Sequence, residues 1–160
     1  MSSRRAREIA YYDAVWGNAA YKWPRQPYHA FADEWKLKPH LDVGCGSGLV
    51  KSEVYVEVSL EALKRFEGKR VLASACHLPF KDKTFASVSA LELLEHLEDP
   101  FKALAEMRRV AKYRLIASVP EKGEHLDPSH KRDIDYDYYG FKPFRIEKRD
   151  HRWCIVESLP

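Results

Sequence analysis

The amino-acid sequence predicts a single α/β domain with a doubly wound, mostly parallel sheet and shortened helices. Short apolar runs of strand length alternate along the chain with segments of helical spacing. The first run ends in Asp42, and Gly44, Gly46 and Gly48 follow at every second position. Glycines let a backbone turn sharply and lie against a ligand, and open α/β sheets bind ligands at the carboxyl ends of their strands.

The composition indicates the size of the domain and the cellular compartment to expect. The chain has 160 residues, of which 45% are hydrophobic and 12% aromatic, enough for one domain with a substantial core. No apolar run is long enough to span a membrane, and the first residues lack the apolar stretch of a signal peptide. The three cysteines are odd in number and have no CxxC spacing, which indicates neither a disulfide framework nor a zinc site. We therefore expect a cytoplasmic protein without a membrane partner or a bound metal.

Charge and amide content add two expectations. The net charge of +3 permits an anionic or RNA substrate without favouring one. Asn18 and Gln26 are the only amides, whereas 32% of the residues are charged. This usage is typical of thermophiles, with lineage bias as the alternative explanation.

Two helices are predicted in residues 1–38, which we expect to form a helical cap. The first covers 3–16 and the second 28–37, with prolines between them. The segment is rich in aromatic residues, among them Tyr12. These side chains either pack against the sheet or form a lid over a ligand.

Residues 39–119 carry the expected core. Its strands are predicted at 40–43, 54–58, 70–73, 86–91 and 113–120, and its helices at 59–66 and 100–112. Ser59 and Asp99 are suitable helix caps, and Pro100 suits the first helical position. Only the ten residues 44–53 join the first two strands, so we expect the helix there to be reduced to about a turn.

The C-terminal part has two predicted units. Residues 120–143 form a loop on the substrate side, because loops carry specificity on such scaffolds. Residues 144–160 alternate in polarity and predict an antiparallel hairpin that turns at Asp150 and His151.

The pattern Asp42-x-Gly44-x-Gly46-x-Gly48 resembles the first motif of the Rossmann-like, class I S-adenosylmethionine-dependent methyltransferases, in particular their small type-11-like domains. A dinucleotide fingerprint would need glycine where Leu49 stands. The resemblance covers about Leu41 to Val119 and implies S-adenosyl-L-methionine as cofactor, with S-adenosyl-L-homocysteine as product.

The resemblance also implies the cofactor-binding residues. Glu57 ends the second strand, where a carboxylate offers paired acceptors to the two ribose hydroxyls. The implied set is Tyr12, Asp42, Gly44, Cys45, Gly46, Gly48, Glu57, Val58, Ser74, Ala75, Cys76, Leu91 and Glu92. Three features depart from the family pattern: Ser74 and Ala86 stand where the family has aspartate, and its Pro-Gly-Gly turn before the fifth strand is missing.

Two histidines are candidates for the catalytic side. His96 lies in the LEHLEDP run, which resembles the fourth family motif, and His130 lies in a DP-x-H string that recurs in the family. His96 either binds the acceptor or removes its proton, or it is a surface or packing residue. His130 either contacts the acceptor or is a turn residue.

The sequence thus predicts methyl transfer to an unidentified acceptor. The chain lacks the Asp/Asn-Pro-Pro-aromatic tetrad of amino methylation and the Pro-Cys nucleophile of cytosine methylation. Its size favours a small-molecule acceptor, while an RNA or protein substrate stays open. Two alternatives remain: an inactive cofactor-binding subunit that acts with a partner, and a nicotinamide-dependent oxidoreductase. A homodimer and a partner subunit are both compatible with the sequence.

Overall fold

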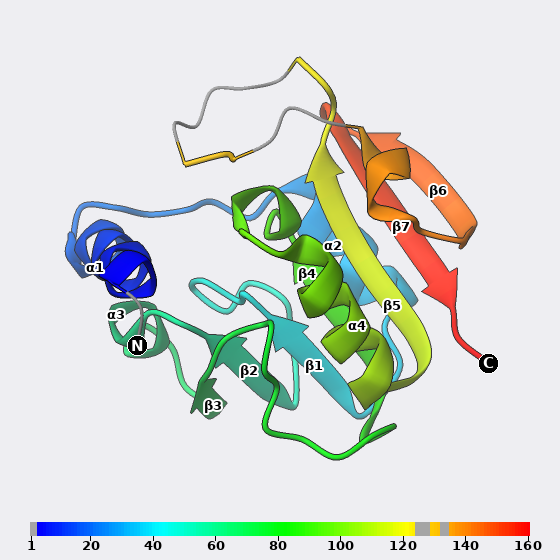
Figure 1. Cartoon of the computed structure of the whole chain (residues 1–160), viewed down its shortest axis with the longest axis horizontal. Coiled ribbons are helices and arrows are strands. Elements are labelled where there is room, and N and C mark those ends of the chain that lie inside the picture. The colour runs from blue at the N-terminus through cyan, green and yellow to red at the C-terminus, as the bar shows by residue number, and fades with distance from the viewer. Residues whose placement is uncertain (1–2, 124–128, 132–134) are drawn as a thin grey trace.

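The computed structural model describes residues 3–123, 129–131 and 135–160. In this part of the chain, seven strands form one sheet of order β3-β2-β1-β4-β5-β7-β6 (Figure 1). The strands are β1 His40–Val43, β2 Val54–Glu57, β3 Lys69–Leu72, β4 Phe85–Leu91, β5 Ala111–Pro120, β6 Pro143–Arg149 and β7 Arg152–Ser158. The first five are parallel, and β7 pairs antiparallel with both β5 and β6. The predicted fold class is confirmed.

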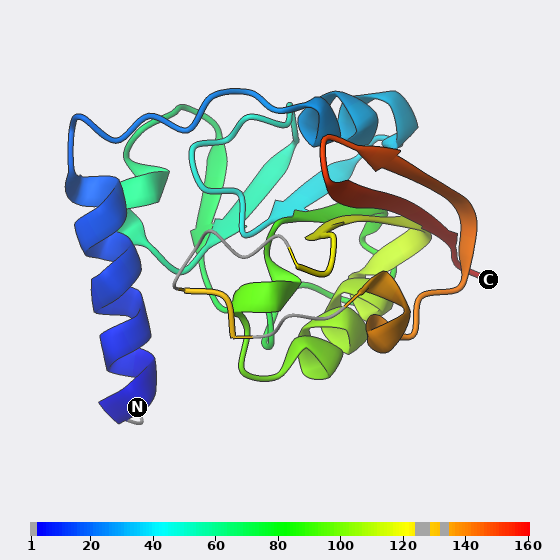
Figure 2. The same ribbon diagram turned by 90° about the horizontal axis from the view of Figure 1, so that it is seen from above.

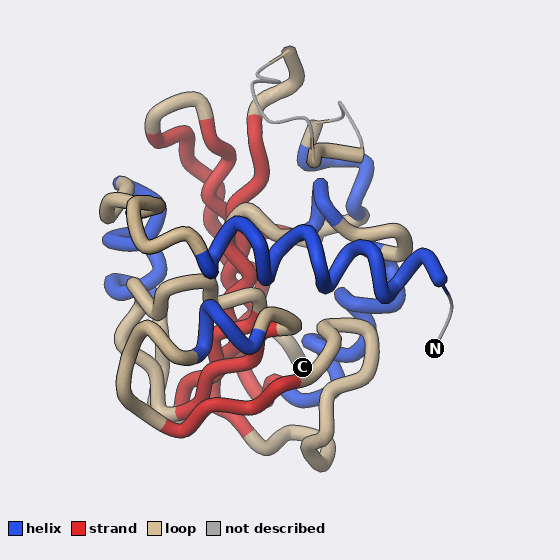
Figure 3. The backbone as a smooth tube through the Cα atoms, turned by 90° about the vertical axis from the view of Figure 1, so that its left-hand side faces the viewer, coloured by secondary structure: helices blue, strands red, loops and turns tan. Residues whose placement is uncertain are grey.

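Helices cover both faces of the sheet. They are α1 Ser3–Gly17, α2 Pro27–Trp35, α3 Leu60–Leu63 and α4 Pro100–Val110, with 3-10 turns η1 Leu94–His96 and η2 Tyr136–Tyr139. Helix α2 lies on one face and α4 on the other (Figure 2), while α1 crosses in front of one end of the sheet (Figure 3). Among the described residues, no helix combines the length and apolar character needed to cross a bilayer.

The core has one layer on each face of the sheet. Successive residues of a strand point to opposite faces. On β5, Leu115 joins the cluster around Leu104 and Met107 of α4, and Ile116 joins the cluster around Phe31 of α2. All five side chains are at most 1% exposed. Truncating such a residue to alanine costs about 2–5 kcal/mol.

Helices α2, α3 and α4 end before their predicted last residues. Asp99 caps α4 as expected, because its carboxylate accepts a hydrogen bond from the Lys102 amide at 2.9 Å. Helix α4 ends at Val110 and β5 begins at Ala111, so the missing Pro-Gly-Gly turn is replaced by a direct junction. Helix α3 ends at Leu63 rather than at residue 66.

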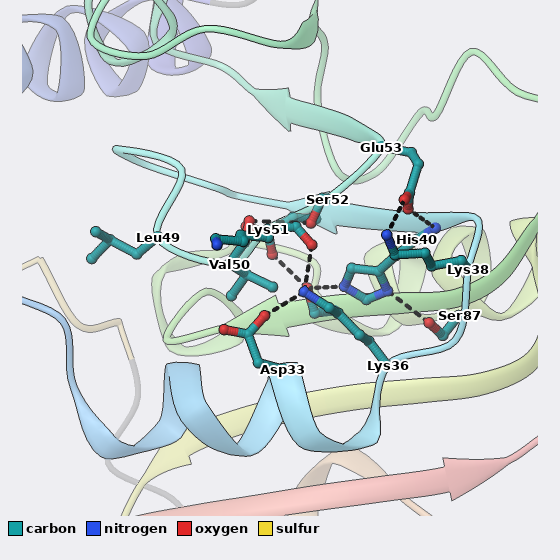
Figure 4. A network of polar contacts seen from close by, with 12 residues as sticks. Asp33, Lys36, Lys38, His40, Leu49, Val50, Lys51, Ser52, Glu53 and Ser87 are labelled. Carbon is teal, nitrogen blue, oxygen red and sulfur yellow. Dashed lines mark hydrogen bonds and ion pairs between the residues drawn. The ribbon is translucent and has the colours of Figure 1, made fainter.

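The connection between β1 and β2 contains one hydrogen-bonded turn and no helix, as its length predicted. The Gly48 amide donates to the Cys45 carbonyl at 2.8 Å. Cationic side chains from the α2 region hold the rest of the segment: Arg25 donates to the Leu49 carbonyl at 2.7 Å, and Lys36 to the Lys51 carbonyl at 2.5 Å (Figure 4). Side-chain contacts to carbonyl oxygens thus replace helical hydrogen bonds in this segment.

The C-terminal hairpin turns where the sequence predicted. Asp150 and His151 have φ of 49° and 57°. Two consecutive residues with positive φ make a type I′ turn, whose twist matches that of the flanking strands. The hairpin places the start of β7 beside the end of β5, at the edge of the sheet where the parallel strands end.

Candidate functional site

A cavity of about 910 Å³ lies at the carboxyl ends of the parallel strands, between the sheet and α1. Its lining comes from α1, the glycine loop, the ends of β2, β3 and β4, and residues 129 and 130. All predicted site residues line this cavity except Asp42 and Gly48. The residues selected from separate motifs are therefore brought together at one site.

The glycine loop lies directly against its neighbours. Gly44 and Gly46 have φ of +68° and +50°, which disfavours any other residue. A Cβ on Gly44 would lie 2.7 Å from a methyl carbon of Leu93, and one on Gly46 would lie 2.8 Å from the Trp16 ring. The loop therefore needs both glycines to pass under α1 and along the cavity wall.

Glu57 fixes the glycine loop to the end of β2. Its Oε2 accepts a hydrogen bond from the Gly46 amide at 3.0 Å, and its Oε1 accepts from the Val58 and Ser59 amides at 2.8 and 3.2 Å. Burial raises the pKa of this carboxyl above its ordinary value. An ionised carboxylate has about four acceptor sites, so three backbone contacts leave room for a ligand hydroxyl.

Asp42 belongs to a buried polar chain beneath the loop. Ser89 donates to its Oδ1 at 2.5 Å, and the same hydroxyl lies 3.0 Å from Nε2 of His40, whose Nδ1 lies 2.7 Å from Ser87 Oγ. Burial raises the pKa of Asp42 to about 7 and lowers that of His40 to about 4. Asp42 therefore supports the loop from below, and its contact with a cofactor stays a prediction.

Gly48, the other predicted residue outside the cavity, faces away from it. A Cβ at this position would lie 2.8 Å from the Phe66 ring, which packs with Tyr55. Gly48 thus shapes the far side of the loop rather than the cavity wall.

The loop after β3 keeps a local hydrogen bond despite its altered residue. Ser74 accepts from the Cys76 amide at 3.2 Å through its hydroxyl. Ala75, between them, is 6% exposed and packs in the core. Serine therefore holds the turn here, and residues 73–77 line the cavity.

Glu92, at the tip of β4, pairs with a residue that the sequence did not single out. Arg152 of β7 forms an ion pair with its Oε2, and the Ser118 hydroxyl donates to its Oε1 at 2.9 Å. Glu92 also has a positive φ of 51°, which is uncommon outside glycine. Arg152 was missed because only the antiparallel pairing of β7 with β5 brings it to this edge.

His96 and His130 lie in contact across the cavity wall. Their ring centroids are 4.7 Å apart and nearly perpendicular, at 73°. Ser129 Oγ lies 2.9 Å from His96 Nδ1, and the Tyr12 ring stands edge-on to His96 at 6.3 Å. His96 is the last residue of η1.

The predicted loop 120–143 is only partly described. Asp127 and Pro128 of the DP-x-H string lie outside the described residues. Ser129, His130 and Lys131 are described, and they approach η1.

Aromatic side chains of the cap region form the outer wall. Tyr12, Trp16, Tyr21, Trp23 and Tyr28 all line the cavity. Trp23 donates its indole N–H to the Tyr28 hydroxyl at 3.1 Å, and burial raises the pKa of that hydroxyl. Trp16 and Trp23 were not among the predicted site residues, although the aromatic-rich segment gave the signal.

This strand order, together with the glycine loop after β1 and an acid at the end of β2, defines a Rossmann-like α/β fold of the methyltransferase class. Comparison with known proteins agrees. Residues 41–114 match the family model described as a methyltransferase domain. Residues 41–114 therefore form a methyltransferase domain, as the motifs indicated.

Two curated relatives show sequence similarity. An uncharacterised protein of Methanocaldococcus jannaschii is 41% identical over 118 residues, which cover 67% of this chain and 50% of that protein. An uncharacterised methyltransferase of Schizosaccharomyces pombe is 33% identical over 98 residues, 45% of this chain and 35% of that protein. The chain thus spans half or less of the length of these relatives.

Solved structures share the fold at low identity. Magnesium protoporphyrin IX methyltransferase from Synechocystis, with bound S-adenosylmethionine, aligns with a TM-score of 0.69 at 13% identity, over 100% of this chain and 99% of that one. A methyltransferase in complex with the Haloferax volcanii Trm112 activator aligns with a TM-score of 0.67 at 13% identity, over 99% and 95%.

Proposed function

We propose that this chain is an S-adenosylmethionine-dependent methyltransferase that acts on a small-molecule acceptor. The observation that carries the proposal is the single cavity that joins the glycine loop and Glu57 at one end to His96 and His130 at the other. Its volume of about 910 Å³ falls in the upper part of the range for small-molecule sites, roughly 300–1,000 Å³.

The residues present suit the adenosyl part of this cofactor. Gly44 and Gly46 line the cavity, and a side chain at either position would collide with Leu93 or Trp16. Glu57 retains acceptor capacity toward a ribose hydroxyl on Oε2, which accepts only one backbone hydrogen bond. Ser74, Ala75 and Cys76 offer backbone groups to the adenine.

The chain's own contribution to the chemistry is positioning and exclusion of water. When bound, S-adenosylmethionine supplies a methyl group already activated by a positively charged sulfur. The aromatic wall of α1 and the following segment suits a cation and covers the site against solvent. His96 and His130 face the same space, where they can orient an acceptor or take its proton.

A second candidate function is a cofactor-binding subunit that acts with a partner protein. The connection 44–53, which contains no helix, favours this function. A single turn and a few side chains cover that flank of the site, so a partner protein can pack there. The structural neighbour in complex with the Haloferax volcanii Trm112 activator supports the proposal of such a partner.

The cellular setting is part of the proposal. An odd cysteine number without CxxC spacing supports a reducing cytoplasm. The scarcity of amides and the charge content support a thermophilic source. A melting temperature above the mesophilic range of about 45–65 °C is expected by calorimetry. A value within that range would contradict the thermophilic assignment.

Calorimetric titration tests the cofactor. S-adenosylmethionine and S-adenosylhomocysteine should bind with one site each, and NAD should not bind. Glu57→Gln should weaken both by about tenfold or more, because an amide nitrogen replaces an acceptor oxygen. Glu61→Gln on α3, outside the cavity lining, is the matched control and should bind like the parent. A Glu57→Gln variant with unchanged affinity would refute the role of this carboxylate.

Methyl transfer separates the two candidate functions. The chain alone should convert S-adenosylmethionine to S-adenosylhomocysteine when a suitable acceptor from a small-molecule panel is present. Cofactor binding without turnover, followed by turnover after a partner is added, would support the subunit function instead.

A further inference from the structure

Three potential metal ligands lie close together at one end of the cavity, where His96 and His130 line the wall and Glu95 is buried next to them. Glu95, His96 and His130 each offer one ligand atom, and all three atoms lie within 4.8 Å of one another. Glu95 has a side chain that is 1% exposed, and that of His96 is 14% exposed.

The cluster is held together by contacts between η1 and residues 129–131. Ser129 Oγ lies 2.9 Å from His96 Nδ1, and the Lys131 amide donates to the Glu95 carbonyl at 2.9 Å. The Lys131 ammonium lies 3.0 Å from a carboxylate oxygen of Glu98. These contacts hold His130 against η1. The fold thus brings His130 next to Glu95 and His96, although it lies far from them in the sequence.

We propose that Glu95, His96 and His130 bind one divalent transition-metal ion, which holds an oxygen atom of the methyl acceptor. The ion's acceptor-side role rests on the proposed methyltransferase function, whereas its binding does not. The site is distinct from the part of the cavity assigned to the adenosyl group, around Glu57 and the glycine loop.

The ligand set and its spacing suit such an ion. Imidazole and carboxylate together suit zinc, iron, manganese, cobalt or nickel. Three protein ligands leave one position open on a four-coordinate ion and two on a five-coordinate one, which a bidentate acceptor can occupy. Ligands on a tetrahedral ion with bonds of about 2.1 Å lie about 3.4 Å apart. Glu95 Oε1 and His96 Nε2 are 3.9 Å apart, too long for a hydrogen bond and close to that spacing. Metal binding would draw the three groups together by a fraction of their present separation.

The contact with Ser129 also prepares His96 as a ligand. A metal-binding histidine usually places its other ring nitrogen in a hydrogen bond, which fixes the tautomer and the ring orientation. With Nδ1 held by Ser129, Nε2 is the nitrogen that faces Glu95.

The ion determines the class of acceptor, namely a molecule with a hydroxyl group and a neighbouring oxygen donor. Coordination lowers the pKa of the hydroxyl, whose proton passes to solvent water. The oxygen then uses its electron pair to form the new O–C bond with the methyl group, while the electron pair of the broken C–S bond stays on sulfur. The methylated product then leaves, and the ion stays bound to the chain with its oxidation state unchanged.

Metal binding is tested on the untagged full chain after treatment with a chelator. Titration with Co²⁺ and Zn²⁺, followed by visible absorption for Co²⁺ and calorimetry for both, should show one ion per chain. Glu95→Gln and His130→Ala should each weaken binding by more than about 100-fold, and Ser129→Ala by about 10–100-fold. His151→Ala, an exposed histidine in the β6–β7 turn, should bind like the parent.

Each variant is also titrated with S-adenosylhomocysteine, and retained binding shows that it is folded. A parent that binds neither ion, or Glu95→Gln and His130→Ala variants that bind as tightly as the parent, would overturn the metal site. A parent that binds metal but not S-adenosylhomocysteine would leave the metal site standing and refute the proposed function instead.

The acceptor side is tested with acetohydroxamate, which chelates through two oxygens. It should change the visible spectrum of the Co²⁺-loaded parent by entering open positions on the ion. An unchanged spectrum would overturn the acceptor-side role.

Discussion

The two ends of the cavity are built in different ways. At the glycine-loop end, one carboxylate accepts hydrogen bonds from backbone amides of residues 46, 58 and 59, which are near neighbours in sequence. At the histidine end, η1, residues 129–131 and β7 come together from distant parts of the chain. The hydrogen bonds at the glycine-loop end join residues close in sequence, whereas the contacts at the histidine end form only when the whole sheet is in place.

This difference leads us to expect the cofactor at the glycine-loop end and the acceptor at the histidine end. A backbone cradle of fixed shape suits a cofactor that is the same throughout a large family. Side chains collected from a loop and a hairpin can change without disturbing the sheet, which suits an acceptor that varies. Substitutions at the two ends should therefore affect different quantities.

The largest effect is expected from breaking the ion pair at the histidine end. Arg152→Met leaves the carboxylate of Glu92, whose side chain is 14% exposed, without its cation. The free energy of unfolding should fall by about 2–3 kcal/mol in urea denaturation. Adding Glu92→Gln should recover much of this loss, since no buried charge is then left alone. Arg145→Met, in an exposed pair with Glu147, is the control and should cost less than about 1 kcal/mol. Equal losses for Arg152→Met and Arg145→Met would show that the pair does not support this end.

The next effect is expected at the glycine-loop end. Gly46→Ala combines a positive φ with a Cβ only 2.8 Å from Trp16. Strain of this kind costs about 1–3 kcal/mol, and S-adenosylhomocysteine affinity should fall by at least about tenfold in calorimetry. Gly17→Ala at the end of α1, where the nearest atom is 3.8 Å away, should leave affinity unchanged. Wild-type affinity in Gly46→Ala would mean that the loop does not contact the ligand.

The buried chain beneath the loop should give a pH dependence. Burial raises the Asp42 pKa from 3.8 to about 7, so the folded chain holds a proton there that the unfolded chain releases, and stability falls as pH rises between those values. Burial lowers the His40 pKa from 6.5 to about 4, so stability rises with pH between about 4 and 6.5. The two effects oppose each other in one window.

Substituting Asp42 and His40 one at a time separates their two effects on stability. Relative to the parent, Asp42→Asn should gain stability on the order of 2 kcal/mol between pH 4 and 7, because the penalty for the buried carboxylate is absent. His40→Gln should change in the opposite direction over the same window. Urea denaturation at pH 4.5, 6 and 7.5 measures both. Differences that do not vary with pH would contradict these shifted pKa values.

The smallest effect is expected at the aromatic wall between the two ends. Tyr12→Leu removes a ring that can face the positively charged sulfur of S-adenosylmethionine, whereas the sulfur of S-adenosylhomocysteine is neutral. Affinity for the charged ligand should fall by about two- to fivefold more than affinity for the neutral one. Tyr113→Leu, an exposed tyrosine outside the cavity lining, is the control and should change neither. Equal losses for both ligands would assign Tyr12 to packing.

The same contrast explains what the sequence could predict. The glycine loop, Glu57 and the α4 cap follow from residue type and short spacing, and each takes its expected place. The short connection 44–53 was predicted from its length, but its support by Arg25 and Lys36 was not, because those contacts depend on where α2 packs.

The contacts that the sequence could not predict are mainly those between residues far apart in the chain. His96 and His130 were predicted separately, and nothing in their spacing indicated that their rings touch. Glu95 was not considered because a buried carboxylate in an apolar run cannot be told from a surface one by sequence alone. Arg152 became visible only through the register of β7 on β5, which pairs Arg152 with Pro120.

A crystal structure of the chain with S-adenosylhomocysteine tests the central claim most directly. We expect the ribose hydroxyls at Glu57, the adenosyl group along the glycine loop, and the sulfur turned toward His96 and His130. A cavity that stays empty at saturating ligand, or a ligand bound elsewhere on the chain, would contradict the account.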